Sequence, residues 1–252
     1  MKLKKLVITS VSVFMLANTL FAGAHGTEWG YEGHNSAENW GDLTPEYGKC
    51  KTGKNQSPIN IITTEVKHSD HQSAINFNYV TPAVEIVNNG HTVQLNIEKG
   101  SSITVNGKEY LLKQFHFHTP SENQINGENF PLEAHFVHVS KDGNLAVVGV
   151  LFNEGVENPV IRDIWRKMPL KKHAKKEIYL DQDDINALLP DKRDYYSFTG
   201  SLTTPPCSEN VKWMVMKHRS YISDSETREF LHNMHHSNNR PVQKIYTRVI
   251  TD

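Results

Sequence analysis

The sequence predicts an α+β protein in which strands dominate: a single domain built on a large, mostly antiparallel, twisted central sheet with a few short peripheral helices. Short runs of alternating apolar and polar residues recur along the chain, which is the period of a half-buried strand. Turn pairs such as Asn89-Gly90, Asn106-Gly107 and Asp142-Gly143 separate these runs and are typical of hairpins. Only two segments show helical periodicity, and neither a repeat nor a long linker divides the chain.

The first 24 residues predict a secretory signal peptide that is cleaved from the mature chain. Three lysines within the first five residues precede an apolar run from Leu6 to Phe21, and Ala22-Gly23-Ala24 follows it. Charge, apolar run and small-residue cleavage site occur in this order in exported proteins. A membrane anchor is the alternative, but the run contains Ser, Thr and Asn and is short for a span of about 20 residues.

Residues 25–252 are therefore expected to form the folded domain, with no stable membrane insertion after cleavage and a periplasmic address in a Gram-negative cell. Without the three leader lysines, 24 basic side chains face 28 acidic ones. This balance indicates neither nucleic acid nor an anionic membrane surface as a partner.

Seven alternating runs are the expected strands, and in chain order they are VEIVNN (84–89), HTVQLNI (91–97), SSITVNG (101–107), EYLLKQFHFH (109–118), LEAHFVHVS (132–140), LAVVGVLF (145–152) and VKWMVMK (211–217). Two helices are expected. One begins at Asn158-Pro159, an N-cap followed by proline, and the other at the Ser223/Glu226 capping box. The run KKHAKKE at 171–177 is interpreted as a solvated surface loop.

Cys50 and Cys207 are the only cysteines of the chain. An even pair in an exported protein predicts one disulfide, with two unpaired thiols as the alternative. Because the bridge would close a long loop, chain entropy gives it up to about 5 kcal/mol of stabilisation.

Three histidines, His116, His118 and His135, lie where strand alternation can bring them together. His116 and His118 share one face of the 109–118 run, and His135 lies on the 132–140 run, the expected antiparallel neighbour. Buried neutral imidazoles need partners for their nitrogens. Three nitrogen ligands leave one tetrahedral position of Zn²⁺ open, as in catalytic zinc sites. Ordinary core or surface histidines are the alternative.

The same alternation predicts the surroundings of this site. Gln114 and Glu133 lie on the ligand faces, and such oxygens usually accept from the ring N–H of zinc ligands. Val137 shares that face and predicts an apolar wall, whereas His138 lies on the opposite face and is expected to be structural. The histidines of HNMHH (232–236) are interpreted as the solvated surface of a helix.

These segments, together with SLTTPPC (201–207), resemble the α-class carbonic anhydrases of the bacterial exported kind. The resemblance spans nearly the whole mature chain and also includes WGYEGHN (29–35), KNQSPINI (54–61), VNNGHTVQ (87–94) and NNRPVQ (238–243). It implies reversible hydration of carbon dioxide to bicarbonate and a proton by a zinc-bound hydroxide, with His116, His118 and His135 as ligands. The alternative is a non-catalytic binding module of the same fold, which should lack at least one ligand histidine.

The resemblance also assigns roles around the metal. Thr203 would be the gatekeeper hydroxyl, Glu122 the acceptor that orients it, and His91 the proton shuttle. Strict alternation groups His91 with Val93 rather than with Gln94, so either the strand begins later or a bulge intervenes. The polar residues implied along the proton path are Tyr31, Asn89 and Gln94. The residues implied in the substrate pocket are Val137, Val147, Leu202, Thr204, Val211 and Trp213, for most of which core packing is the alternative. Bacterial relatives are often dimers, which leaves a homodimer open.

Overall fold

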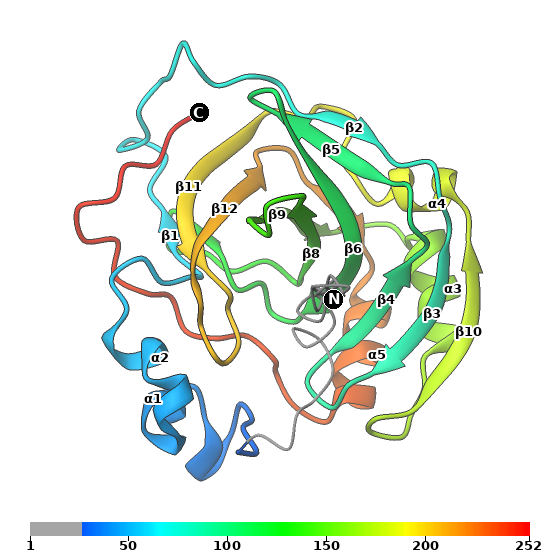
Figure 1. Ribbon diagram of the computed structural model, residues 1–252. Helices are drawn as coiled ribbons and strands as arrows, with labels where there is room; N and C mark the ends of the chain where they lie inside the picture. Colours follow the sequence, from blue (N-terminus) through cyan, green and yellow to red (C-terminus); the bar gives the residue numbers. More distant parts are fainter. Residues whose placement is uncertain (1–26) are drawn as a thin grey trace, which may run out of the picture.

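One curled sheet of eleven strands organises the molecule, with short helices outside it (Figure 1). The computed structural model describes residues 27–252, so the expected signal peptide at 1–24 lies outside the described residues. The strands of the sheet are β2 (Asn76–Asn78), β3 (Ala83–Asn88), β4 (Val93–Ile97), β5 (Ser102–Val105), β6 (Lys108–His118), β8 (Leu132–Ser140), β9 (Leu145–Glu154), β10 (Lys175–Leu180), β11 (Tyr195–Ser201), β12 (Glu209–Met216) and β13 (Ser220–Ile222).

The remaining elements are short. A separate parallel pair consists of β1 (Asn60–Ile61) and β7 (Gln124–Ile125). The helices are α1 (Trp40–Leu43), α2 (Lys49–Thr52), α3 (Pro159–Lys167), α4 (Gln182–Ala187) and α5 (Asp224–Met234), with 3-10 turns at Gly33–Asn35 and Pro45–Tyr47.

The main path of the sheet runs β10-β3-β4-β6-β8-β9-β12-β11. Within this sheet β9 pairs in parallel with β12 and β13, and the other pairs are antiparallel. The predicted fold class, a strand-dominated domain with a mostly antiparallel sheet, is confirmed. The long central strands β6, β8 and β9 are neighbours, so residues from three consecutive strands meet in the middle of the sheet (Figure 1).

Both helices predicted from capping signals are present. The Asn158 side chain accepts hydrogen bonds from the N–H groups of Val160 and Ile161, which starts α3. Ser223 and Glu226 form the expected capping box at the start of α5. The two helices contact each other, since the Trp165 indole N–H donates to the Glu226 carbonyl at 3.1 Å.

The interpretation of 171–177 as a loop is wrong for its second half, because Lys175–Leu180 forms the edge strand β10. Ile178 and Leu180 point inward and are buried, while Tyr179 between them is exposed. Lysines on an edge strand discourage pairing with another chain. Because lysines are also typical of loops, the strand was not predicted from the sequence. Helix α4 was not predicted either.

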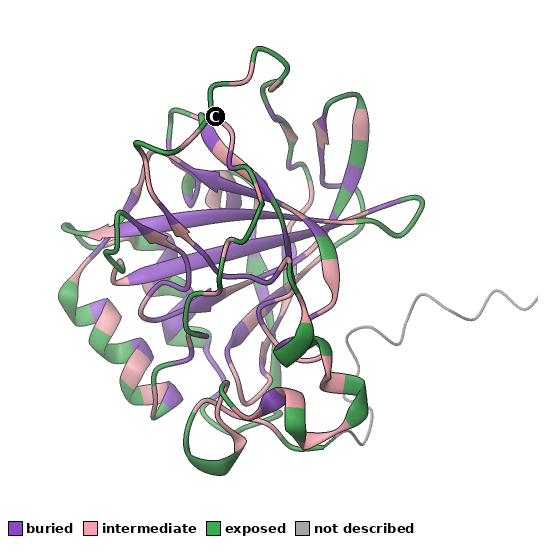
Figure 2. Ribbon diagram, turned by 90° about the vertical axis from the view of Figure 1, so that its left-hand side faces the viewer, coloured by how far each residue is buried: buried purple, intermediate pink, exposed green. Residues whose placement is uncertain are grey.

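Apolar side chains pack on both sides of the central strands, which are buried along most of their length (Figure 2). One cluster includes Phe115, Phe117 and Phe136. A second cluster on the other side includes Val137 and Trp213. Alternation along β6 and β8 therefore divides the core, and the predicted histidine face lies with the second cluster.

The predicted disulfide is confirmed: Cys50 of α2 is bonded to Cys207, which follows β11 by six residues. It ties the N-terminal helical segment to the loop between β11 and β12. None of the helices in residues 27–252 combines the length and apolar character needed to cross a bilayer.

Candidate metal centre

Strands β6 and β8 bring three imidazoles together. Their register places His116 directly opposite His135, and His118, two residues further along β6, lies on the same face as His116. One nitrogen from each ring lies within 4.8 Å of the others. In the part of the chain that the structure describes, no other group of His, Cys, Asp or Glu side chains converges in this way.

The second nitrogen of each β6 histidine is already bound. His116 Nδ1 lies 2.8 Å from Gln114 Oε1, on the same face of β6. His118 Nδ1 lies 2.7 Å from the backbone carbonyl of Asn238. Both rings therefore present Nε2 to the common centre, and the buried Nε2 of His118 has no hydrogen-bond partner there.

The third ring is held from the opposite side. His135 Nε2 lies 3.0 Å from Glu133 Oε1, which leaves Nδ1 facing the other two histidines. The Glu133 carboxylate is fully buried and accepts from the Asn123 side chain at 2.7 Å and from the N–H groups of Glu122 and Asn123. Gly149 of β9, opposite His135, leaves room for it, because a Cβ there would lie 2.9 Å from Glu133 Oε1.

The residues present fit a zinc ion. Burial lowers the pKa of His118 to about 4 and the pKa values of His116 and His135 well below the ordinary value. All three rings are therefore neutral at pH 7, the form whose lone pair binds a metal. Three converging ring nitrogens, of which His118 Nε2 is buried without a hydrogen-bond partner, match the ligands of a zinc site with an open fourth position. Oriented acceptors on the outer nitrogens are typical of zinc ligands.

An apolar wall adjoins the histidines. In β8, β9 and β12, Val147 is paired with Val137 on one side and with Trp213 on the other. The Trp213 indole and the His135 ring are nearly perpendicular, at a centroid distance of 4.8 Å. Val211 is fully buried in the same cluster, and Leu202 packs against it while remaining partly exposed.

The loop after β11 carries Thr203 and Thr204. Thr203 is 5% exposed, and Thr204 is partly buried with its carbonyl accepting from the Cys207 N–H at 2.9 Å. The Leu202 N–H donates to the Ser208 carbonyl at 2.9 Å, so the loop is closed on itself. The disulfide at Cys207 fixes its far end.

Glu122 lies beneath this loop and beside the histidines. Its Oε2 is 3.6 Å from His118 Nε2 and 3.8 Å from His135 Nδ1, and its Oε1 accepts from the Arg240 N–H at 2.8 Å. Burial raises the pKa of the Glu122 carboxyl well above its ordinary value, while the Arg240 N–H and the Thr203 side chain act in the opposite direction.

His91 lies in the turn before β4, because the strand begins at Val93. The Asn89 side-chain oxygen accepts from the N–H groups of His91 and Thr92, which holds the turn. The conflict with strict alternation thus has its answer in a late strand start. The His91 ring stacks on the Trp29 indole at 3.6 Å and 8°.

A cavity of about 190 Å³ opens at His91, and its wall includes Tyr31, Lys172 and His236. Burial lowers the pKa of His91 to about 4, and the nearby Lys172, His173 and His236 act in the same direction. The buried hydroxyl of Tyr31 has no hydrogen-bond partner among the described residues.

The remaining predicted residues lie at defined places. Gln94 is opposite His116 in the β4–β6 pair and donates to Asn96 at 2.7 Å. His138 is fully buried on the opposite face, with Nε2 2.8 Å from the Tyr79 hydroxyl. His235 and His236 do not belong to the helix, because α5 ends at Met234. His235 adopts a left-handed conformation, and the partly exposed His236 forms part of the cavity wall.

The residues of the site that were not identified from the sequence include Asn238 and Gly149. Asn238 supplies the carbonyl that holds His118, and a backbone acceptor 120 residues away leaves no signal in a sequence pattern. Gly149 lies inside a run of apolar strand residues, where an isolated glycine indicates a close approach by another group.

Comparison with known proteins agrees with this geometry. The family model described as eukaryotic-type carbonic anhydrase matches residues 35–252. A carbonic anhydrase of Neisseria gonorrhoeae is 47% identical over 246 residues, covering 96% of this chain and 95% of the relative. The solved α-carbonic anhydrase of Thermovibrio ammonificans, in complex with sulfanilamide, has a TM-score of 0.86 at 44% identity, covering 90% of this chain and 100% of that one. The Photobacterium profundum α-carbonic anhydrase has a TM-score of 0.82 at 41% identity, covering 89% and 100%.

Proposed function

Because the chain belongs to the α-class, or eukaryotic-type, carbonic anhydrases, we propose that His116, His118 and His135 hold the Zn²⁺ at which it hydrates carbon dioxide reversibly to bicarbonate and a proton. The observation that carries this assignment is the convergence of three neutral imidazole nitrogens, each ring with an oxygen within 3.0 Å of its outer nitrogen. When bound, zinc supplies Lewis-acid chemistry that brings the pKa of a water molecule near neutrality, so that hydroxide is available as the nucleophile.

The apolar wall suits an uncharged, linear substrate. Val137, Val147 and Trp213 lie beside the histidines and offer carbon dioxide a surface without hydrogen-bonding groups. Leu202, which is partly exposed, borders the same wall from the loop that carries Thr203. Carbon dioxide would thus be held between the wall and the metal centre, and bicarbonate, which is charged, is disfavoured there.

Thr203 and Glu122 would set the direction of a hydrogen bond at the centre. In its ionised form the Glu122 carboxylate only accepts, so a hydroxyl that donates to it keeps its own lone pairs facing outward. The Thr203 oxygen would then accept a hydrogen bond from the attacking oxygen and so orient it. The position of Glu122, fixed by the Arg240 N–H, supports this role.

His91 would export the proton to solvent from the cavity at the rim. Its pKa of about 4 in the position stacked on Trp29 is too low for a carrier at neutral pH. We therefore infer that His91 accepts the proton after leaving the Trp29 ring, because greater exposure removes the burial that lowers its pKa. Tyr31, Asn89 and Gln94 would order water between the centre and this rim.

The address of the protein is proposed to be the periplasm. The leader pattern at 1–24 supports export, and the single disulfide is stable in an oxidising compartment.

Replacing one ligand tests the centre. We expect His118→Ala to lose bound zinc and nearly all hydration activity, because two nitrogens cannot hold the ion tightly. Zinc content of the purified mature chain and stopped-flow hydration of carbon dioxide are the measurements. His232→Ala, at an exposed histidine outside the centre, is the matched control and should retain both. Full activity and zinc in His118→Ala would refute the ligand set.

A further inference from the structure

Arg240 is a buried cation to which the proposed reaction assigns no task. Its side chain follows α5 and is only 2% exposed. Burial lowers its pKa to about 10, so it remains charged at neutral pH. A charge in the interior is costly unless hydrogen bonds compensate for lost water.

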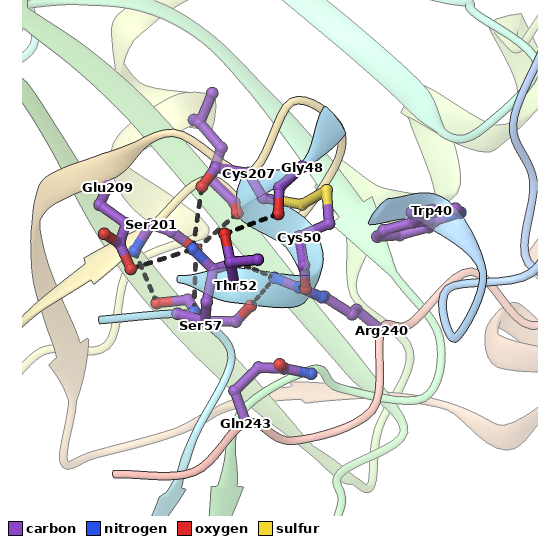
Figure 3. The surroundings of a disulfide bond; sticks show 12 residues. Trp40, Gly48, Cys50, Thr52, Ser57, Ser201, Cys207, Glu209, Arg240 and Gln243 are labelled. Carbon is purple, nitrogen blue, oxygen red and sulfur yellow. Dashed lines mark hydrogen bonds between the residues drawn. A yellow bond between two sulfur atoms is a disulfide. The ribbon is translucent and has the colours of Figure 1, made fainter. Parts of the chain in front are cut away.

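The guanidinium is held by neutral oxygens. Nη1 donates to the Gln56 side-chain oxygen at 2.9 Å and to the Ser57 carbonyl at 2.8 Å, and Nη2 donates to the Cys50 carbonyl at 2.9 Å. The group also lies over the Trp40 ring, 5.7 Å from its centroid. Figure 3 shows Arg240 reaching from its own segment toward Cys50 and Ser57, beside the disulfide.

The same contacts reach both ends of the Thr203 loop. Gln56 donates to the Cys207 carbonyl at 3.0 Å, four residues after Thr203. Ser57 and Ser201 exchange two hydrogen bonds between backbone N–H and side-chain hydroxyl, at 2.9 and 3.1 Å, two residues before Thr203. The guanidinium is therefore attached to a frame that borders Thr203 on both sides.

The backbone of Arg240 contacts Glu122, the proposed partner of Thr203. Its N–H donates to Glu122 Oε1 at 2.8 Å, while Oε2 is the oxygen that faces the histidines. The side chain of the same residue is anchored by three hydrogen bonds. One residue thus connects Glu122 to the frame that carries Thr203.

We propose that Arg240 is a positioning residue: its guanidinium fixes the backbone N–H that holds Glu122, and so aligns Glu122 with Thr203. This inference rests on the proposed roles of Thr203 and Glu122 in carbon dioxide hydration. Ordinary anchoring of the N-terminal segment is the competing explanation, and it predicts an effect on stability that does not depend on Glu122.

A double-mutant cycle on the zinc-loaded mature enzyme separates the two explanations. Arg240→Lys keeps the charge but loses the planar fork that reaches several acceptors. We expect kcat/KM for carbon dioxide to fall about 10-fold, since small misplacements at a reacting centre have effects of this order or larger. In the Glu122→Gln background the same substitution should cost less than about 2-fold, because the carboxylate that it aligns is gone. Bound zinc should stay unchanged in all four proteins.

Arg248→Lys is the matched control. Arg248 lies in the same C-terminal segment and donates to the carbonyls of Thr199, Lys244 and Ile245, but it does not contact Glu122. This variant should leave kcat/KM unchanged in both backgrounds.

Two results would overturn the proposal: an unchanged kcat/KM in Arg240→Lys, or an equal loss with and without the Glu122 carboxylate. If Arg240→Lys does not fold, Gln56→Met takes its place in the same cycle with the same criteria; it removes one acceptor of the guanidinium together with the Gln56 hydrogen bonds to the Cys207 carbonyl and the Glu209 carboxylate. Absence of hydration by the wild-type enzyme would instead defeat the proposed function itself, and is recognised before any variant is made.

Discussion

Single buried groups give this protein properties that exposed copies of the same residues would not have. The three centre histidines are neutral because burial lowers their pKa values, and the neutral form is the one that binds zinc. His138 experiences the same burial on the opposite face of β8, where its Nε2 lies 2.8 Å from the Tyr79 hydroxyl. The same residue type therefore serves chemistry on one face of a strand and structure on the other.

His138 makes the stability of the fold depend on pH. Burial lowers its pKa to about 3, against 6.5 for an ordinary histidine. Between these values the unfolded chain binds more protons than the folded one, so stability is fully present above pH 6.5 and is lost as pH falls toward 3. From pH 7 to pH 5 this histidine should remove about 2 kcal/mol from the free energy of unfolding.

Urea unfolding at both pH values measures this effect. We expect His138→Gln to be less stable at pH 7 yet to lose about 2 kcal/mol less than wild type between pH 7 and pH 5. His232→Gln, at an exposed site, should keep the wild-type dependence. An unaltered pH dependence in His138→Gln would show that another group carries it.

At the scale of elements, the register of β6, β8 and β9 builds the centre. Pairing places His116 opposite His135, and His135 opposite Gly149. Period-two alternation was sufficient to predict the shared face of the histidines, since a slip of one residue would turn His135 into the other cluster. Alternation could not reveal whether there is space for the Glu133 carboxylate beside His135. That space depends on Gly149 in the neighbouring strand.

Gly149→Ala tests this dependence. The added Cβ would lie 2.9 Å from Glu133 Oε1, so the carboxylate must shift, which disturbs its 3.0 Å contact with His135 Nε2. Loss of such a partner weakens zinc binding by about 10- to 100-fold, and we expect a decrease near the lower end of that range. Competition with a chelator of known affinity measures it. Gly30→Ala, where a Cβ meets no atom within 4 Å, is the control, and equal affinities in the two variants would contradict the explanation.

Elements without a strong pattern were the ones that the sequence did not reveal. Edge strand β10 is rich in lysine and looks like a loop, because an edge needs only one buried face and gains from charges on the other. His236 reaches the rim cavity because His235 adopts a left-handed conformation with φ 66°, at a residue type that gives no warning of it. Local sequence predicts elements well where burial is periodic and poorly where a single dihedral angle decides.

At the scale of the whole molecule, segments that are distant in the sequence hold the residues of the site in place. The Asn238 carbonyl holds His118, the Arg240 N–H holds Glu122, and the Cys50–Cys207 disulfide holds the loop of Thr203. None of these contacts follows from periodicity, because each joins segments that are more than 100 residues apart in the chain. The disulfide was predicted from the cysteine count alone, whereas Asn238 and Arg240 lie in NNRPVQ, a segment that the resemblance included without explaining it.

The disulfide has two separable effects, a global one and a local one. Its half-cystines are 157 residues apart, so the bridge restricts a large part of the unfolded chain. Chain entropy predicts that Cys50→Ser with Cys207→Ser lowers the free energy of unfolding by up to about 5 kcal/mol. The local effect should be smaller, because Arg240 still holds the Cys50 carbonyl and Gln56 still holds the Cys207 carbonyl when the sulfur bridge is absent.

We therefore expect the double serine variant to unfold at a much lower denaturant concentration than wild type. At a temperature where the variant is folded, its kcat/KM should fall by less than about 10-fold, because the hydrogen bonds alone can keep the Thr203 loop near its place. Guanidinium unfolding and stopped-flow hydration on the same preparation measure the two effects. Adding Arg240→Lys to the serine variant should then lower kcat/KM by more than it does in wild type, because the bridge and the guanidinium hold the same frame. Equal losses in the two backgrounds would mean that the disulfide acts on the unfolded chain alone.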